Sequence, residues 1–562
     1  MMRPTVLLKR SLIFVHRWMG VALSVVFMLW FVSGIVMMYW SFPGVSAEAR
    51  LERAPALDPA QIRYTPEQAY AILDRDQPPG QVILTSYDGR PVYRFGGGGG
   101  GRGKGGGGRR GGGGGGVPMV FADDGAVPPE VDDAMVDRAA AAWAKLPLSQ
   151  AKKESVEEVD QWTVAGNFRT MRPLYKYSFP DGQQVYVNGR TADVVQYTTT
   201  ESRFWAYLGA IPHWMYFTPL RQHQPQWFGF VVWSSAIGTV AAILGVIVAI
   251  WMLSPSKRYR HAGMPTSIPY KGWKRWHTII GLFFGVVTAT WAFSGLLSMG
   301  PFRIVDRITE LIVPSANKGD LEAAKGKGKG KGKGGNRGPN LANALRGAGP
   351  FDLAAYAAKT PRDAIASLGT TFQAKELDFT MFDGEPLYMA TDSAGATRII
   401  PLNGEPKPSF SADRVMEIVR EAAGKNLAEL RMMDEYDAYY LDRRGERPLP
   451  VVYARMNDEA STRYYIDPVS GRVAGNYSSR NWISRWMYHG LHSLDFPWLY
   501  KHRPLWDIVV ITLMLGGTAL CLTSLILTYK VLARKLAAAL RTRLNQPSED
   551  LALEPVAKGD LP

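Results

Sequence analysis

Four histidines of this 562-residue chain form two matched pairs. His16 and His277 each open an apolar segment in which Gly follows after four residues, Trp after fourteen and Ser-Gly after seventeen. His213 and His492 each precede another apolar segment, and each is followed ten residues later by a further histidine. Apolar composition alone does not explain this shared spacing. The pairs therefore indicate a duplicated segment that places chemically active side chains at equivalent depths.

His16 and His277, called the inner pair, have the chemistry of a haem site. Two neutral imidazoles that face each other in a helical bundle can be the axial ligands of a haem iron. Gly20 and Gly281, one turn further along, would let a flat macrocycle approach the backbone. Three basic residues could meet the haem propionates: Arg17, Lys274 and Arg275. The alternative is that both histidines are interfacial polar residues beside an aromatic belt.

His213 and His492, called the outer pair, predict a second haem by the same reasoning. His489 lies three residues before His492. Residues at this spacing share one face of an α-helix, so His489 could replace or support His492 as a ligand. The candidate propionate partners at this site are Arg221, Lys501 and Arg503.

The three remaining histidines have weaker claims to a ligand role. His223 and His502 each lie four residues before the Trp that begins an apolar segment, and solvent-facing positions are expected for both. His261 has no counterpart and is expected in a loop. The chain has no His-Glu-x-x-His zinc motif and no Gly-x-Ser-x-Gly elbow. Zinc bound by the histidines just before the second and fourth apolar segments is an alternative. Few carboxylates that could complete such a site lie nearby, and Asp495 and Asp507 are two of them.

The spacing within the first apolar segment suggests a path across a membrane. From His16 to Ser33 is 17 residues, which corresponds to about 26 Å of α-helix. Two haems could therefore stack across one bilayer. Trp30 and Trp291 would lie toward the outer haem, where they either pack in the bundle or relay electrons.

Four charge-free blocks begin after these histidines, and each exceeds the roughly 20 residues that cross a bilayer as a helix. The blocks are 18–47, 222–256, 278–302 and 508–529. The predicted spans lie within 1–40, which includes a short start, and at 227–253, 277–300 and 505–530. The first span is expected to be a retained helix, because its apolar run is longer than that of a signal peptide.

Lys and Arg predict the orientation of the spans. They concentrate before the first span, in the loop 254–276 and in the tail 531–562. Cytoplasmic segments retain such residues, so both termini and this loop are predicted to be cytoplasmic. The protein is thus expected in the inner membrane of a bacterium, with its two long connections in the periplasm.

The two long connections, 41–226 and 301–504, each have the signals of an α+β domain. Thr65 and Gln68 form a capping-box pattern that opens a helix. Asp88-Gly89 predicts a turn between two strands, and further strand series precede the second and fourth spans.

The junctions before the second and fourth spans extend the duplication. His-x-Pro-x-Trp begins at His223 and again at His502, at an offset of 279 residues that the outer pair shares. The predicted fold is therefore a membrane α-helical protein whose four-helix bundle arises from a duplicated helix–outer domain–helix unit.

The formal net charge of +15 does not indicate a nucleic-acid partner, because of where the charge lies. Two glycine-rich runs, 96–116 and 325–337, hold ten of the basic residues. They are expected to be flexible, solvated loops, either tolerated insertions or electrostatic lures for an anionic ligand or surface. Cys521 is the only cysteine and lies in the fourth block, which excludes a disulfide or an iron–sulfur site within the chain.

With these residues considered together, the chain resembles the PepSY-associated transmembrane family, which includes iron-regulated inner-membrane proteins and periplasmic siderophore reductases. The strings that carry the resemblance are HRWMG at His16, PHWMYFTPLR at Pro212, WHTIIGLFFGVVTATWAFSG at Trp276, YYIDPVSGRV at Tyr464 and YHGLHSLDFPWLY at Tyr488. The resemblance implies two PepSY-like periplasmic domains and, in the reductase branch, two b-type haems held by bundle histidines.

Two functions follow as hypotheses. The first is a haem-dependent ferric-siderophore reductase, which passes electrons from a membrane quinol or a separate cytoplasmic reductase to a periplasmic ferric chelate. The second is a non-enzymatic PepSY membrane protein that binds a periplasmic partner, in peptidase regulation or siderophore handling. Transport is disfavoured because the interior of the four spans carries no ionisable residues.

Overall fold

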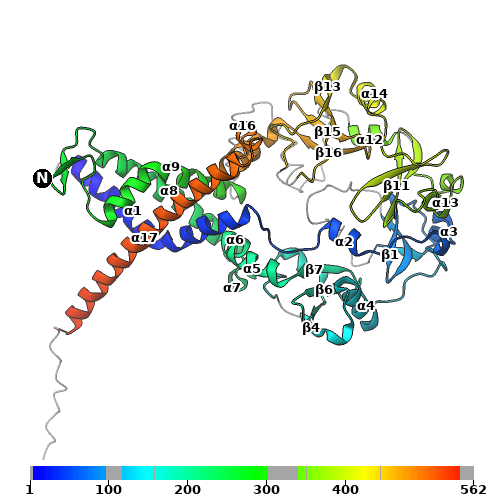
Figure 1. Ribbon diagram of the computed structural model, residues 1–562, viewed down its shortest axis with the longest axis horizontal. Helices are drawn as coiled ribbons and strands as arrows, with labels where there is room; N and C mark the ends of the chain where they lie inside the picture. Colours follow the sequence, from blue (N-terminus) through cyan, green and yellow to red (C-terminus); the bar gives the residue numbers. More distant parts are fainter. Residues whose placement is uncertain are drawn as a thin grey trace, which may run out of the picture. The chain divides into compact units, whose positions relative to one another are not determined.

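The computed structural model describes residues 4–96, 117–156, 159–300, 340–347, 349, 351–442 and 445–544. The chain forms two compact units, and each is discontinuous in sequence (Figure 1). The membrane unit comprises Met1–Ile35, Val232–Phe293 and Asp507–Pro562, and the soluble unit comprises Val36–Val231 and Ser294–Trp506. Both predicted glycine-rich loops lie outside the described residues, apart from Gly96.

All four predicted spans are helices that are long and apolar enough to cross a membrane. They are α1 (Pro4–Met37), α8 (Gln224–Met252), α9 (Trp273–Ser298) and α17 (Leu505–Leu544). The last helix continues past the predicted end of its span because the following sequence is rich in Ala, Leu, Lys and Arg, which are strong helix formers. A hairpin of β8 (Tyr259–His261) and β9 (Met264–Thr266) joins α8 to α9, so His261 ends a short strand.

Glycines let the helices of the membrane unit approach closely. An added Cβ at Gly238 of α8 would lie 2.5 Å from the ring of Phe27 on α1. On α17, a Cβ at Gly517 would lie 2.0 Å from the ring of Phe31. Small residues at helix contacts are typical of membrane bundles, where close packing stabilises association.

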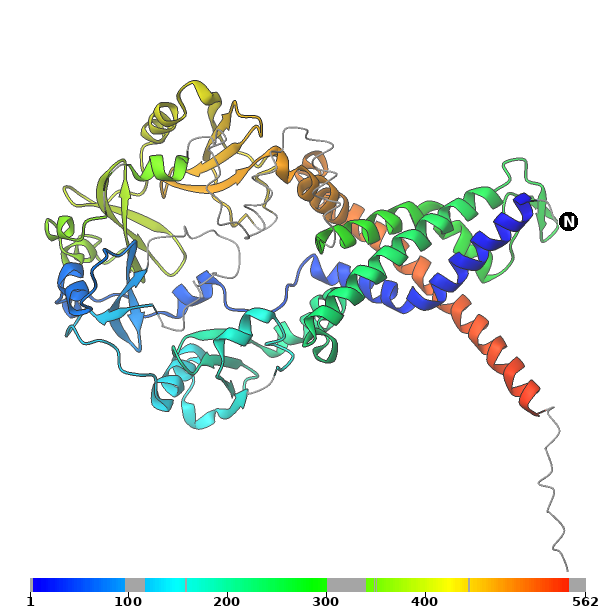
Figure 2. The ribbon, with the colours of Figure 1, turned by 180° about the vertical axis from the view of Figure 1, so that it is seen from behind.

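A six-stranded sheet in the soluble unit combines strands from both long connections. Its order is β12-β11-β10-β1-β2-β3. The strands are β1 (Gln81–Tyr87), β2 (Arg90–Gly96), β3 (Met119–Phe121), β10 (Glu376–Phe382), β11 (Glu385–Thr391) and β12 (Thr397–Pro401). β1 pairs antiparallel with β10, with Val82 opposite Phe379, and the two views in Figures 1 and 2 show these blue and yellow-green strands together. The sequence pattern predicts the strands but not this pairing between distant connections.

Two four-stranded sheets complete the soluble unit and confirm its α+β character. The first is β4 (Lys152–Val156), β5 (Leu174–Ser178), β6 (Gln184–Asn188) and β7 (Val194–Thr198). The second is β13 (Leu427–Met433), β14 (Val451–Met456), β15 (Arg463–Asp467) and β16 (Arg472–Tyr477). Apolar residues at helical spacing pack α4 (Asp133–Ala144) on the first sheet and α14 (Ala412–Ala423) on the second.

Short helices connect these parts, and the predicted capping box is confirmed at one of them. They are α2 (Ala47–Arg53), α3 (Pro66–Ile72), α5 (Thr200–Leu208), α6 (Ala210–Trp214), α7 (Thr218–Arg221), α12 (Leu341–Arg346), α13 (Pro361–Ala366), η7 (Ile483–Gly490), α15 (Leu491–Ser493) and α16 (Pro497–Tyr500). Single 3-10 turns are η1 (Pro59–Gln61), η2 (Leu148–Gln150), η3 (Gly166–Met171), η4 (Ala354–Ala357), η5 (Gly424–Asn426) and η6 (Ser479–Asn481). At the start of α3, Thr65 and Gln68 exchange side-chain-to-backbone hydrogen bonds.

Candidate functional site

The membrane unit brings the inner pair face to face. The ring centres of His16 on α1 and His277 on α9 are 6.2 Å apart, with an angle of 39° between the ring planes. The Nδ1 atom of His16 lies 2.9 Å from the carbonyl oxygen of Ala241 on α8. A carbonyl oxygen only accepts, so this ring donates from Nδ1 and keeps its Nε2 lone pair for a ligand bond.

The second inner histidine is held in the same tautomer from α17. Nδ1 of His277 lies 3.0 Å from the hydroxyl oxygen of Thr523. That hydroxyl donates to the carbonyl of Leu520 at 2.7 Å, so it accepts the Nδ1 proton of His277. Partners of this kind orient metal-bound histidines and raise their basicity. All four membrane helices therefore contribute to the inner pair.

The soluble unit brings the outer pair together in a similar way. The ring centres of His213 on α6 and His492 on α15 are 6.0 Å apart, at 65° between planes. Nδ1 of His492 lies 3.1 Å from the hydroxyl oxygen of Ser294, and the Tyr488 ring stacks on His492 at 5.3 Å. Both histidines are half-buried. This pair thus has nearly the same separation as the inner pair.

His489 and His492 differ in their surroundings. Residues up to Gly490 form the π-helix η7, and His492 lies in the short helix α15 that follows. His489 is exposed and its ring lies 4.8 Å from that of Tyr488. The geometry therefore favours His492 as the residue that faces His213.

The separations of both pairs fit a metal held between two imidazoles, and the number of ligands then favours a haem over a bare ion. Two metal–nitrogen bonds of about 2 Å, plus about 1 Å from each nitrogen to its ring centre, place roughly 6 Å between the ring centres. Within the described part of the chain, no group of three or more His, Cys, Asp and Glu side chains could hold a metal ion. A haem needs only two protein ligands, because its porphyrin supplies the others. The residues present therefore fit this cofactor.

Arg221 is the most buried of the basic residues predicted to meet haem propionates. Its side chain is 6% exposed and lies over the rings of Tyr216 at 4.9 Å and Trp227 at 4.2 Å. Its Nε atom is buried and has no hydrogen-bond partner among the described residues. A buried guanidinium of this kind suits a carboxylate partner.

The other basic candidates differ in their surroundings. Lys501 forms a 2.5 Å ion pair with Glu435, and Arg503 lies over the Trp506 ring at 5.0 Å. Arg275 donates to the Thr266 hydroxyl at 2.9 Å. Arg17 and Lys274 are exposed. Lys501 is therefore already in an ion pair with a carboxylate of the protein.

The two tryptophans pack in the bundle, which leaves their electron-relay role a prediction, and His223 and His502 face solvent. Trp291 is buried and packs 5.6 Å from the Phe31 ring, and Trp30 packs 5.6 Å from Phe27, as expected for bundle packing. His223 and His502 are exposed, in agreement with solvent-facing positions.

Gly245 of α8 is a site residue that sequence reasoning missed. A Cβ atom there would lie 2.6 Å from Cε1 of His16. Gly20 and Gly281, which were predicted to admit the macrocycle, have more room, since a Cβ at either would meet its nearest atom at 3.8 or 3.7 Å. Gly245 lies in an unbroken apolar segment, so only the fold reveals its contact.

Replacing Gly245 with alanine is expected to displace the His16 ring and weaken the inner pair. Overpacking of this kind costs about 1–3 kcal/mol, which corresponds to a loss of roughly 5- to 150-fold in the affinity of a ligand site. The haem-to-protein ratio of the purified protein measures the effect. Gly229→Ala is the matched control on α8, because nothing lies within 4 Å of its added Cβ. Equal ratios in the two variants would contradict this packing role.

Comparison with known protein families agrees with the four apolar helices. A family model described as the PepSY-associated TM region matches residues 13–375, which is more than half of the chain. No curated protein sequence matches the chain significantly.

Proposed function

Because the chain belongs to the PepSY-associated transmembrane family, we propose that it is a di-haem b-type oxidoreductase of the bacterial inner membrane. In this proposal it passes electrons across the membrane to a periplasmic ferric chelate, as a ferric-siderophore reductase does. The observation that carries the proposal is the similar ring separation, 6.2 Å and 6.0 Å, in two histidine pairs.

The proposed chemistry divides between the cofactor and the chain. Haem iron supplies reversible one-electron exchange between its ferric and ferrous forms. His16, His277, His213 and His492 would each present Nε2 to an iron, and Arg221 would neutralise a propionate. The acceptors at Nδ1 of His16 and His277 would make these imidazoles more basic, which favours ferric iron and hence donation of an electron. One ferric chelate takes one electron, so a two-electron quinol would match two of them.

Repeated contacts at the inner pair support the duplicated helix–outer domain–helix unit. The His16 ring donates to the carbonyl of Ala241, and the His277 ring donates to Thr523, whose hydroxyl donates to the carbonyl of Leu520. Ala241 and Leu520 are 279 residues apart, which is the offset of the outer pair. A two-fold arrangement of the two copies would explain why each pair takes one histidine from each copy.

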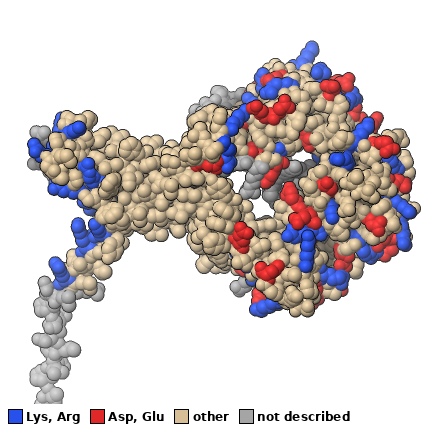
Figure 3. All heavy atoms as spheres, viewed as in Figure 1, with Lys and Arg blue, Asp and Glu red and all other residues tan. Residues whose placement is uncertain are grey.

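The distribution of charge on the membrane unit supports cytoplasmic termini. In Figure 3 its helices are tan along their length, and Lys and Arg gather where the β8–β9 hairpin lies and along the extension of α17. Such clusters mark the cytoplasmic side, so the soluble unit would be periplasmic.

A reduced-minus-oxidised spectrum of the purified full chain tests the proposal. We expect b-type bands and about two haems per chain after expression with sufficient haem. A protein without a Soret band would instead favour the second hypothesis, a non-enzymatic membrane protein that binds a periplasmic partner. In proteoliposomes, quinol-dependent production of Fe(II) from an added ferric chelate then tests the reaction.

A further inference from the structure

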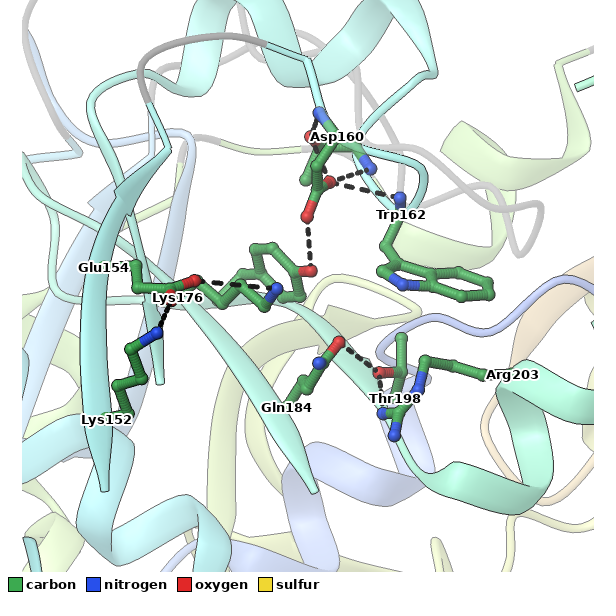
Figure 4. A network of polar contacts seen from close by, with 10 residues as sticks. Lys152, Glu154, Asp160, Trp162, Lys176, Gln184, Thr198 and Arg203 are labelled. Atoms are coloured by element: carbon green, nitrogen blue, oxygen red, sulfur yellow. Dashed lines mark hydrogen bonds and ion pairs between the residues drawn. The ribbon is translucent and has the colours of Figure 1, made fainter. Parts of the chain in front are cut away.

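A short loop in the soluble unit, residues 160–163, is closed and anchored by one carboxylate. Oδ1 of Asp160 accepts the backbone N–H groups of Trp162 at 3.1 Å and Thr163 at 3.0 Å (Figure 4). Its other oxygen accepts the hydroxyl of Tyr186 on β6 at 2.6 Å. The Asp160 carboxylate therefore fixes the loop and ties it to the first four-stranded sheet.

The loop 437–440 has the same arrangement on the second four-stranded sheet. Oδ1 of Asp437 accepts the backbone N–H groups of Tyr439 at 2.8 Å and Tyr440 at 2.7 Å. Its other oxygen accepts the hydroxyl of Tyr465 on β15 at 2.8 Å. β6 and β15 are each the third strand of their sheet, so the two Asp–Tyr contacts are equivalent. We call each contact, with its loop, a latch.

Both tyrosines are suited to hold a latch closed. Burial raises the pKa of Tyr186 above its ordinary value, and the charge of Asp160 raises it further. Burial and Asp437 have the same effect on the pKa of Tyr465. Each phenol therefore stays protonated and donates its hydrogen bond at physiological pH.

The first latch holds the chain just after His213. From the middle of the loop, the side-chain amide of Gln161 donates to the carbonyl of Tyr216 at 2.6 Å and accepts from the Thr218 hydroxyl at 3.0 Å. Tyr216 is the third residue after His213 and follows Met215, which ends α6 in the left-handed conformation with φ 53°. The loop thus fixes the point at which the histidine-bearing turn ends.

The second latch reaches the equivalent point after His492 through a different side chain. Arg485 donates from Nε to the carbonyl of Ala438 in the loop, and from its terminal nitrogen to the carbonyl of Asp495 at 2.5 Å. Asp495 is the third residue after His492, and Leu494 before it has φ 52°. Both copies therefore hold the same backbone carbonyl, one through glutamine and one through a 6% exposed arginine.

We propose that the two latches are positioning elements. By fixing the backbone just after His213 and His492, they determine where the two rings of the outer pair lie. A ligand that shifts loop 160–163 or loop 437–440 would then change how His213 and His492 hold their cofactor. The inner pair is held by side chains and carbonyls of the membrane helices, so it should not respond. This inference rests on the proposed haem function, but the placement of the histidines can be tested without haem.

Hydrogen exchange of the full chain in nanodiscs tests the latches directly. Tyr186→Phe should speed exchange in residues 210–216, and Tyr465→Phe should speed it in residues 489–495. The expected change is roughly tenfold, the factor that corresponds to about 1.4 kcal/mol for a lost hydrogen bond to a charged group. Tyr177→Phe, on β5 of the same sheet, is the matched control, because its hydroxyl donates to Asp137 of α4 at 2.5 Å and contacts neither loop.

Gln161→Ala separates the latch from the stability of the sheet. It leaves the Asp160–Tyr186 contact intact, so exchange should rise in residues 210–216 and stay unchanged in residues 489–495. Unchanged exchange in both segments of the Tyr186→Phe/Tyr465→Phe protein would overturn the proposal, as would an equal change in Tyr177→Phe.

Carbon monoxide provides the second readout. A reduced haem with two histidine ligands excludes carbon monoxide, and a loosened ligand admits it. We expect half of the haem in the double variant to become reactive, and none in Tyr177→Phe. Reactivity of both haems would overturn the assignment to the outer pair. A wild-type protein without haem would reject the proposed function, whereas the exchange experiment would still decide the latches.

Discussion

Under the proposed di-haem function, replacing His277 with alanine is expected to lower the haem content from about two haems per chain to about one. The ring of His277 lies 6.2 Å from that of His16, and its Nδ1 is held by Thr523, so no other side chain takes its place without a change of the helices. Loss of an axial histidine removes the bond that holds the cofactor in a site without other covalent links. The pyridine haemochrome assay and the protein concentration together measure the ratio.

The His16→Ala variant should give the same ratio as His277→Ala, because the two residues serve one site. The double variant should lose nothing more. Quinol-dependent reduction of a ferric chelate should fall by roughly 100-fold or more in all three, since the path across the membrane is interrupted. His261→Ala is the matched control, as this histidine lies in β8 outside both pairs. Full haem content in His277→Ala would reject the inner assignment.

Features encoded by local sequence were predicted well. The four apolar spans, the capping box at Thr65 and the hairpin at Asp88-Gly89 all occur in the structure. Each depends on a few neighbouring residues: an unbroken apolar run, a side chain that caps a helix, or a pair that adopts positive φ at 51° and 77°. These causes act between residues that are close together along the chain.

Features that depend on distant contacts were not predicted. The pairing of β1 with β10 joins residues almost 300 positions apart, and alternation within each strand does not name its partner. The same limit applies at the site. Repetition of histidines in sequence indicated which rings meet, but the contact of Gly245 with His16 and the support from Gln161 and Arg485 arise only after folding.

The repeat itself contains one further clue to the outer site. Ser294 belongs to the Ser-Gly that recurs at a fixed distance from each inner histidine, and its hydroxyl bonds to Nδ1 of His492. A small polar residue in an apolar helix often marks a hydrogen bond that the bilayer cannot supply. The position of Ser294 at the far end of its span from His277 is thus a signal for a polar partner at the outer side.

The second large effect is expected at the outer site, where two neighbouring histidines give opposite results. His492→Ala should remove one haem, and His489→Ala should keep both. The ring of His492 lies 6.0 Å from that of His213 and is oriented by Ser294, whereas His489 is exposed on the π-helix beside Tyr488. Each substitution removes one histidine side chain from the same segment, so each variant is the control for the effect of the other on folding.

The spectra of these variants also show which haem is lost. The haem that remains in His492→Ala should disappear when His277→Ala is added, because the two ligands belong to different pairs. Reductive titration should then show one midpoint potential in His492→Ala and in His277→Ala, and two in His489→Ala and in the wild-type protein. If His489→Ala loses a haem and His492→Ala does not, the exposed histidine is the ligand, and the segment from η7 to α15 must rearrange when haem binds. Loss of a haem in both variants would mean that the two histidines act together, through the contacts of each ring with Tyr488.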